Sequence, residues 1–379
     1  MTARSPGTAE RLAYLDGLRG LAAFIVCVGH FMRSDPEFLY SGTWHDAPRL
    51  IKVLWPLLTG RIWVFLFFIL SALSLSLAED SRRRRGEAAS LRLYARRRFW
   101  RISPMYYLAF AVGLLVIPLL PDVAATRQNV ILQIPKDVSW SGSISHLFFV
   151  HNLSSGWQFQ GDAPLWTMAY EVQMYAIFPL MYFAMRRYNP FAVFAGLVAL
   201  TFVSRAAIES PPLLGLLPCF ALGALLARVR GRFPRQVGPW FWAAGLTVGA
   251  IGVFTLQPAA FGVLTVGDTP WIIAFGLLFV AMDVMPGGHW NPGNWRPLRW
   301  LGDRSFSVYT IHWILLETLV AVFGSHLTSP RQLALAVTVV GFPLTLVLGA
   351  LTYRWVELPG MRRMTSRRAA QVAATRSAS

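Results

Sequence analysis

The stretch LDGLRGLAAFIVCVGHF, from Leu15 to Phe31, decides the fold class of this chain. It is apolar enough to enter a bilayer, yet it contains Asp16, Arg19 and His30. Ionisable side chains inside a membrane segment are costly and normally face a protein interior or a water-filled cavity, so they are functional candidates. The stretch therefore predicts a membrane helix that carries functional residues.

The spacing of these residues places them on nearly one face of the predicted helix. Arg19 and His30 are eleven positions apart, which corresponds to roughly 16 Å of rise and about three turns. Asp16 lies one turn before Arg19, so the two form a charged pair. His30, near the outer end, is placed to take a proton from an alcohol. The alternative is an interfacial histidine bonded to a backbone carbonyl.

The composition is that of a polytopic membrane protein. Of the 379 residues, 55% are hydrophobic, and the formal charge is +17. The chain is too apolar for ordinary soluble domains. Its 33 arginines alternate with long apolar spans, which the positive-inside bias explains better than nucleic-acid binding does. Cys27 and Cys219 both lie in apolar spans, so neither a disulfide framework nor a metal site is expected.

The hydrophobic segments predict an all-α protein with about ten transmembrane helices. The loop arginines place both termini in the cytoplasm, and the expected location is the cell (inner or plasma) membrane. Residues 1–11 form a cytoplasmic segment, 12–359 the transmembrane domain and 360–379 a basic, disordered tail. The predicted spans are 13–32, 60–79, 102–120, 165–185, 190–208, 211–228, 238–256, 262–285, 304–323 and 333–353.

A second ionisable residue lies inside a predicted span. Glu171 occurs in PLWTMAYEVQMYAIFPL, roughly 9 Å below the start of the span near Leu165, at a depth similar to that of His30. A carboxylate there can orient the imidazole and stabilise its protonated form. Tyr175 lies four residues further, on the same face. The alternative is a buried carboxylate held by Trp and Tyr hydrogen bonds.

The run ARRRFWRISPMYY is the third candidate site. Arg98 and Arg101 are three residues apart and share a helix face. Guanidinium groups suit phosphates, so a phosphate-bearing cytosolic cofactor can dock here, with Tyr106 as a further contact. From the spacing alone, an anchor for anionic lipid head groups is favoured.

Two further ionisable residues belong to the last two predicted spans. His312, in WLGDRSFSVYTIHWILLE, lies near mid-depth with Tyr309 one turn away. A structural, hydrogen-bonded role for His312 is at least as probable as a catalytic one. Glu357, in YRWVELPGMRR, is interpreted as an ion-pair partner for the inner arginines.

The remaining polar residues carry less information. His146 and His151 lack the spacing of metal ligands and are expected at the surface or at an interface. Ser71 and Ser74 have no base beside them in the sequence, so a serine nucleophile is not indicated.

Six stretches together resemble the acyltransferase 3 family of polytopic membrane enzymes. Arg19 and His30 stand at the family's spacing of ten intervening residues, and Arg98, Arg101 and Pro104 resemble its RxxR element. Ala72 follows Ser71 where the family commonly has Gly. The six stretches are, in chain order, LDGLRGLAAFIVCVGH, WVFLFFILSAL, RRFWRISPMYY, PLWTMAYEVQMYAIFPL, LGDRSFSVYTIH and YRWVELP.

The resemblance implies an O-acyltransferase. The donor is expected to be cytosolic acyl-coenzyme A, usually acetyl-coenzyme A. The acceptor is expected to be a hydroxyl of an extracytoplasmic or lipid-linked carbohydrate, such as a surface glycan, or of a hydrophobic small molecule. His30 is then the central catalytic residue, assisted by Arg19, while Arg98 and Arg101 hold the coenzyme phosphates. No metal is implied.

Two mechanistic routes and two other classes of protein stay open. The acceptor can attack the thioester directly, with Glu171 supporting the imidazolium, or the acyl group can first be carried on His30. The main alternative is a proton-coupled transporter or flippase, because intramembrane Asp, Arg, Glu and His also suit a proton relay. A non-catalytic sensor or complex subunit is the third possibility. Binding of acyl-coenzyme A distinguishes these three classes, because the enzyme must bind it and the other two need not.

Overall fold

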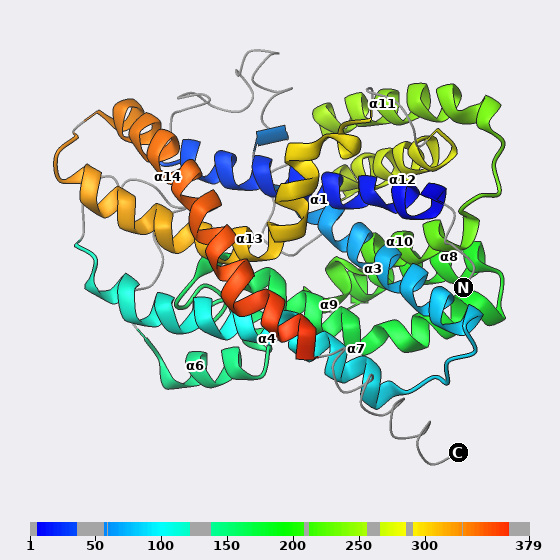
Figure 1. Ribbon diagram of the computed structural model, residues 1–379, viewed down its shortest axis with the longest axis horizontal. Coiled ribbons are helices and arrows are strands. Elements are labelled where there is room, and N and C mark those ends of the chain that lie inside the picture. The colour runs from blue at the N-terminus through cyan, green and yellow to red at the C-terminus, as the bar shows by residue number, and fades with distance from the viewer. Residues whose placement is uncertain are drawn as a thin grey trace.

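The computed structural model describes residues 6–35, 57–58, 60–121, 138–207, 212–255, 266–285, 291–327 and 329–363. The regular structure of these residues is helical throughout, without a strand (Figure 1), which confirms the all-α class. Most of the connection between the first two predicted spans, and the residues from 364 on, lie outside them. The main helices are α1 (Pro6–Met32), α3 (Arg61–Arg84), α4 (Leu91–Val116), α6 (Trp140–Leu147), α7 (Trp166–Arg187), α8 (Pro190–Ala207), α10 (Leu217–Val229), α11 (Gly238–Thr255), α12 (Thr269–Val284), α13 (Arg296–Gly324) and α14 (Pro330–Thr352).

Each of the ten predicted spans overlaps a helix. Five helices within the described residues are both long and apolar enough to cross a bilayer. Others are shorter than the about 20 residues that a crossing takes, among them α10 with 13 residues and α12 with 16. A count of ten spans with cytoplasmic termini therefore stays a prediction. The five long helices are Ala13–Met32, Arg61–Arg84, Leu91–Leu119, Arg296–Gly324 and Pro330–Arg363.

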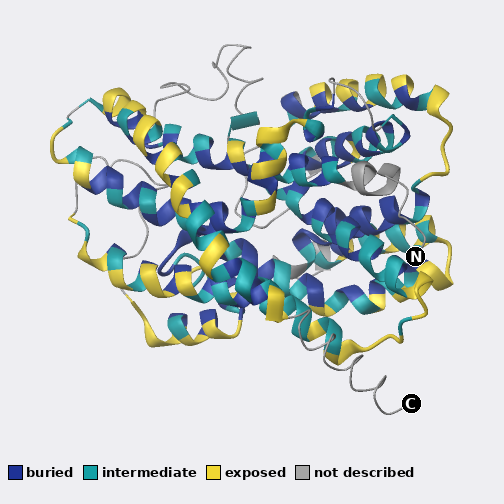
Figure 2. Ribbon diagram, viewed as in Figure 1, coloured by how far each residue is buried: buried dark blue, intermediate teal, exposed yellow. Residues whose placement is uncertain are grey.

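Large apolar side chains are exposed along the outer faces of the bundle. Figure 2 shows buried residues gathered in the interior, and exposed ones along peripheral helices such as α11 and α14. Leu115 and Leu180 are 70% and 72% exposed, and Trp240 is 76% exposed. A soluble protein rarely exposes contiguous apolar surface of this extent. The protein is therefore a membrane protein whose lipid-facing surface is apolar.

The helix α3 runs through the centre of the bundle and is held at both ends by ion pairs. At its start, the Arg61 guanidinium lies 2.7 Å from the buried Asp268 carboxylate before α12. Near its other end, Asp80 pairs with Arg186 of α7 at 2.9 Å and with Arg228 of α10. Removing one partner of a buried pair leaves an uncompensated charge, so these contacts fix the position of α3.

The helices α1 and α13 approach each other closely enough for main-chain contact. A Cβ atom on Gly20 would lie 1.9 Å from the carbonyl oxygen of Leu298, and one on Gly302 would lie 1.7 Å from that of Asp16. No side chain fits in either place. Small residues at helix interfaces allow this close approach, which in a membrane provides the van der Waals packing that holds helices together.

A π-helical turn, Tyr353–Glu357, follows α14 and places a carboxylate inside the protein. Glu357 is 1% exposed and accepts a hydrogen bond from Ser307 of α13 at 2.6 Å. It also forms an ion pair with Arg101 of α4, as the sequence predicted for the inner arginines. Turns of this kind are frequent at functional sites because they redirect single side chains.

The α1–α13 contact gives a prediction for stability. Gly302→Ala forces the two backbones apart and should lower the stability of the purified protein by about 1–3 kcal/mol or more. The measurement is the thermal unfolding midpoint in detergent. The matched control is Gly196→Ala in α8, where a Cβ meets nothing within 4 Å. This control should be neutral or stabilising, since Ala favours helix more than Gly does. Equal midpoints for the two variants would contradict the proposed packing.

Candidate active site

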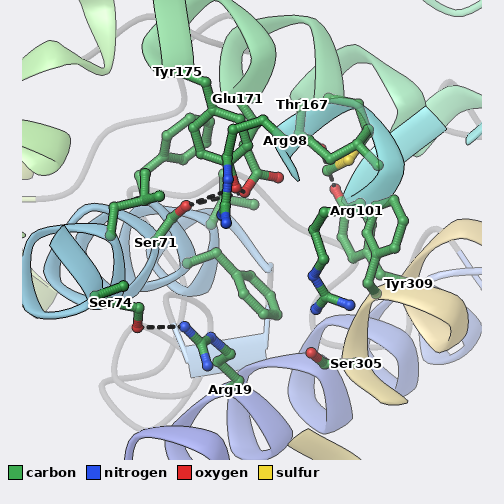
Figure 3. A pocket seen from close by; sticks show the side chains of 18 residues that line it. Arg19, Ser71, Ser74, Arg98, Arg101, Thr167, Glu171, Tyr175, Ser305 and Tyr309 are labelled. Carbon is green, nitrogen blue, oxygen red and sulfur yellow. Dashed lines mark hydrogen bonds between the residues drawn. The ribbon is translucent and has the colours of Figure 1, made fainter. Parts of the chain in front are cut away.

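A cavity of about 300 Å³ lies where α1, α3, α4, α7 and α13 meet. One face of α3 forms its floor, from Val64 through Ser71 to Ala78, a length of about 21 Å at 1.5 Å per residue. Along it, Ser71 and Ser74 lie between two apolar stretches, which include Phe68 and Leu75. Figure 3 shows the polar lining residues, which are Arg19, Ser71, Ser74, Arg98, Arg101, Thr167, Glu171, Tyr175, Ser305 and Tyr309.

Three guanidinium groups reach into one part of the cavity, which we call its arginine end: Arg19 from α1, and Arg98 and Arg101 from α4 (Figure 3). Arg19 forms the expected pair with Asp16 at 2.7 Å, and its other terminal nitrogen donates to the Ser74 hydroxyl at 2.5 Å. Asp16 does not line the cavity. Its role is thus to hold Arg19 in place.

Arg98 and Arg101 are held in different ways. Arg101 is neutralised by Glu357. Arg98 forms no ion pair within the described residues, and its Nε is buried without a hydrogen-bond partner there. Its guanidinium lies over the ring of Tyr175, 5.6 Å from the centroid. A partly desolvated guanidinium without a carboxylate partner attracts anionic ligands, and its planar fork matches phosphate oxygens.

Glu171 lies in the middle of the cavity, bonded to two hydroxyl groups. Ser71 donates to its Oε1 at 3.0 Å, and Tyr175 donates to the same oxygen. The Ser71 and Tyr175 hydroxyl oxygens are 3.1 Å apart. Ser71, which has no base beside it in the sequence, therefore has a carboxylate beside it in the structure. The carboxylate comes from α7, 100 residues later in the chain, and only helix packing brings it to α3.

The prediction that Glu171 supports His30 is wrong. Within the described residues, the hydrogen-bond partner of the His30 ring is His312, at 2.9 Å between Nδ1 and Nε2. His30 lies beside Gly60, at the start of α3, whereas Glu171 contacts Ser71, eleven residues and roughly 16 Å further along that helix. The sequence places Glu171 and His30 at similar depths only if the ends of their spans are assumed. Span ends do not determine how far one helix is shifted along another.

Tyr309 stands between the cavity and the histidine pair. Its ring lines the cavity beside Phe67, with ring centroids 6.0 Å apart. The Tyr309 hydroxyl accepts a hydrogen bond from Thr167 at 3.1 Å. On its other side, its ring centroid is 5.5 Å from that of His312. The cavity thus extends from the arginine end to Tyr309, whose ring neighbours that of His312.

Comparison with known families shows which family this chain belongs to. Residues 12–354 match the family described as an acyltransferase domain, which is nine-tenths of the chain. The protein belongs to this family. It is therefore an acyltransferase, and the transporter and sensor alternatives lose their support. The cavity and the histidine pair both lie within the matched residues.

Two curated relatives align with this acyltransferase over most of its length. Acyltransferase MdmB of Streptomyces mycarofaciens is 25% identical, over 96% of this chain and 95% of the relative. O-acetyltransferase OatA of Staphylococcus aureus is 24% identical, over 91% of this chain but only 57% of the relative. No solved structure matches the chain.

Tyr106 does not belong to the cavity of this acyltransferase, so the prediction that it contacts a cofactor is wrong. It lies eight residues, roughly 12 Å, beyond Arg98 along α4 and is fully buried. Its hydroxyl lies 3.0 Å from Nδ1 of His146 and 3.4 Å from Nδ1 of His151. The residue is part of a structural cluster outside the site.

The same cluster overturns the surface alternative in the prediction that His146 and His151 lie at the surface or at an interface. Both are 0% exposed, and their rings stack face to face with centroids 3.7 Å apart. Each Nε2 lies 3.0 Å from a carbonyl oxygen, that of Trp157 or of Leu165. Since a carbonyl only accepts, each Nε2 carries a hydrogen, and each Nδ1 can accept from the Tyr106 hydroxyl.

Burial lowers the pKa of His146 to about 3, with a further contribution from His151, and burial lowers the pKa of His151 to about 4. Between the ordinary value of 6.5 and these values, the unfolded chain binds protons that the folded chain does not. The pair therefore makes the protein less stable as the pH falls from about 6.5 to about 4.

The corresponding test compares unfolding midpoints in detergent at pH 7 and pH 5. His146→Gln/His151→Gln should have a lower midpoint than wild type at pH 7, because the stacked pair is lost. It should also lose less of its stability at pH 5, because neither glutamine titrates. His326→Gln, at an exposed position after α13, serves as the control and should keep the wild-type pH dependence. An unchanged pH dependence in the double variant would contradict the assignment.

Proposed function

We propose that this acyltransferase moves an acyl group, acetyl in the first instance, from cytosolic acyl-coenzyme A to a hydroxyl group. The acceptor is an extracytoplasmic or lipid-linked carbohydrate, or a hydrophobic small molecule, and the enzyme resides in the cell membrane. One observation carries the proposal: a single cavity has arginines at one end and extends to Tyr309, whose ring neighbours that of His312 in the His30–His312 pair. The name of the OatA relative, an O-acetyltransferase, supports acetyl transfer to oxygen.

The arginine end fits the phosphates of the donor. Arg98 offers a guanidinium without an ion-pair partner in the described chain, and Arg19 lines the cavity from the opposite helix. Arg101 is already neutralised by Glu357, so it contributes mainly hydrogen bonds and shape. Bidentate contacts between guanidinium and phosphate are among the stronger charge-assisted hydrogen bonds.

The long floor of the cavity fits the pantetheine arm of the coenzyme. Its apolar stretches can contact the methylene and methyl groups of the arm. Glu171, which is bonded to Ser71 and Tyr175, can accept hydrogen bonds from the arm's amide groups. Glu171 thus acts on the donor in this proposal, instead of on the imidazolium of His30.

The thioester then lies near Tyr309, beside the histidine pair. His30 removes the proton of the acceptor hydroxyl, and the oxygen attacks the acyl carbon. The carbon–sulfur bond breaks, and the thiolate takes up the proton from His30 to leave as the free thiol. No cofactor besides the donor is consumed in this direct route.

Donor binding and slow hydrolysis test the proposal. Wild-type protein in detergent should bind acetyl-coenzyme A and hydrolyse its thioester slowly, which releases coenzyme A as the free thiol. Arg98→Gln should weaken binding by about 10- to 100-fold, the equivalent of one or two charge-assisted hydrogen bonds. His30→Ala should bind the donor normally without hydrolysing it. The measurements are calorimetric titration and a colorimetric thiol assay.

Arg92→Gln provides the matched control, since Arg92 is an exposed arginine on the same helix. It should leave the Kd for acetyl-coenzyme A unchanged. A wild-type protein that does not bind the donor would overturn the donor assignment. Equal weakening by both arginine substitutions would show that only the general positive charge of α4 matters.

A further inference from the structure

The hydrogen bonds of the histidine pair determine which nitrogen atoms carry hydrogen. Nδ1 of His312 lies 2.6 Å from the carbonyl oxygen of Tyr309. A carbonyl oxygen can only accept, so this Nδ1 carries a hydrogen. Neither ring has a carboxylate within hydrogen-bond distance among the described residues, so no partner there stabilises a cation on His312. In neutral His312, Nε2 therefore has a free lone pair.

The tautomer of His30 follows from that of His312. Nδ1 of His30 lies 2.9 Å from Nε2 of His312. Because Nε2 of His312 accepts, Nδ1 of His30 donates, and Nε2 of His30 is left without a hydrogen. The two ring planes are within 6° of each other, with centroids 5.2 Å apart. This is the geometry of an in-plane N–H···N hydrogen bond.

The surroundings hold the two rings in this arrangement. His312 is 0% exposed. The ring of Trp313 stands nearly perpendicular to both, at 84° to His30 and 87° to His312. Rotation of either imidazole would break a hydrogen bond. The contacts thus select one orientation of each ring as well as one tautomer.

The unprotonated nitrogen of His30 faces a position without a side chain. A Cβ atom on Gly60 would lie 3.7 Å from Nε2 of His30. Gly60 precedes α3 with φ of 80°, a conformation that side chains disfavour. His30 itself is only half-buried. Because residue 60 is a glycine, no Cβ atom occupies the space beside this nitrogen.

We infer that His312 is the positioning residue that makes Nε2 of His30 the catalytic base. The Tyr309 carbonyl, His312 and His30 form a chain in which a neutral imidazole fills the place that a carboxylate has in a Ser-His-Asp triad. When Nε2 of His30 takes the proton of the acceptor hydroxyl, its Nδ1–H still donates to His312, which stabilises the imidazolium. The inference rests on the proposed function for the reaction, but the tautomer does not depend on it.

The direct test is the tautomer itself. In protein labelled with ¹⁵N-histidine, ¹⁵N–¹H NMR in detergent should show His30 with its hydrogen on Nδ1, and His30→Ala identifies the signal. In His312→Leu, the hydrogen should move to Nε2, the form that free imidazole side chains favour. Finding wild-type His30 with its hydrogen on Nε2 would overturn the inference, whether or not the donor binds.

The kinetic test uses two substitutions that differ only in hydrogen bonding. In His312→Gln the amide oxygen can accept from Nδ1 of His30, whereas His312→Leu offers no acceptor. Thiol release from acetyl-coenzyme A, with water as the acceptor, should fall about 100-fold or more in kcat for His312→Leu and within about tenfold of wild type for His312→Gln. The KM for acetyl-coenzyme A should change in neither, because the arginine end is untouched.

His326→Leu controls for loss of a histidine elsewhere on the protein and should keep wild-type kcat. Equal losses in His312→Gln and His312→Leu, or a parallel rise in KM, would show that His312 only supports the packing of α13. If wild-type protein neither binds nor hydrolyses the donor, the proposed function fails, and the NMR result alone decides the role of His312.

Discussion

The main-chain contact between α1 and α13 is the constraint on which the site depends. Gly20 and Gly302 let the two helices approach so closely that the carbonyl oxygens of one occupy the space of side chains on the other. This contact sets the register of the whole helix pair. The middle of α1 thereby presents Arg19 to the cavity, and its last turn brings His30 against His312 of α13. A shift of one turn, about 5 Å, would separate the two imidazoles entirely.

The charge of the residues that line the cavity differs along its length, because different helices supply them. The arginine end collects side chains from α1 and α4, where the charge of Arg19 and Arg101 is partly balanced by Asp16 and Glu357. That balance makes it possible to bury several guanidinium groups together, because an uncompensated cluster would be costly. Arg98 is left as the guanidinium without such a partner in the described residues, so the positive charge available to a ligand is concentrated on it.

The sequence predicts those features that depend on one helix at a time. The helical class, the Asp16–Arg19 pair and the shared face of Arg98 and Arg101 all follow from periodicity within a segment. The partners of Glu171 and His30 do not, because they depend on how far one helix slides along another. The glycine contacts that set this register involve positions with no chemical signal of their own.

Two other errors have the same physical origin. Tyr106 shares its sequence run with the arginines but lies beyond them, because α4 continues for several turns past the arginine end. His146 and His151 fall in a connection between predicted spans, which favours a position at the surface or at an interface. Packing of that connection against α4 buries both rings completely. Hydrophobicity identifies which segments enter a membrane, but it does not show which parts of the connections fold back onto the helices.

Tyr309 links the two halves of the site through two different parts of the same residue. Its ring closes the cavity beside Phe67, and its carbonyl oxygen accepts the hydrogen bond that orients His312. A donor arm that fills the cavity therefore ends against the same helical turn that fixes the tautomer of the base. In the proposed reaction one rigid element would position both the thioester and the base, which is how a reaction between two substrates gains from fixed geometry. Because α1 supplies both Arg19 and His30, the glycine contact with α13 would align the proposed phosphate binding with the proposed proton removal.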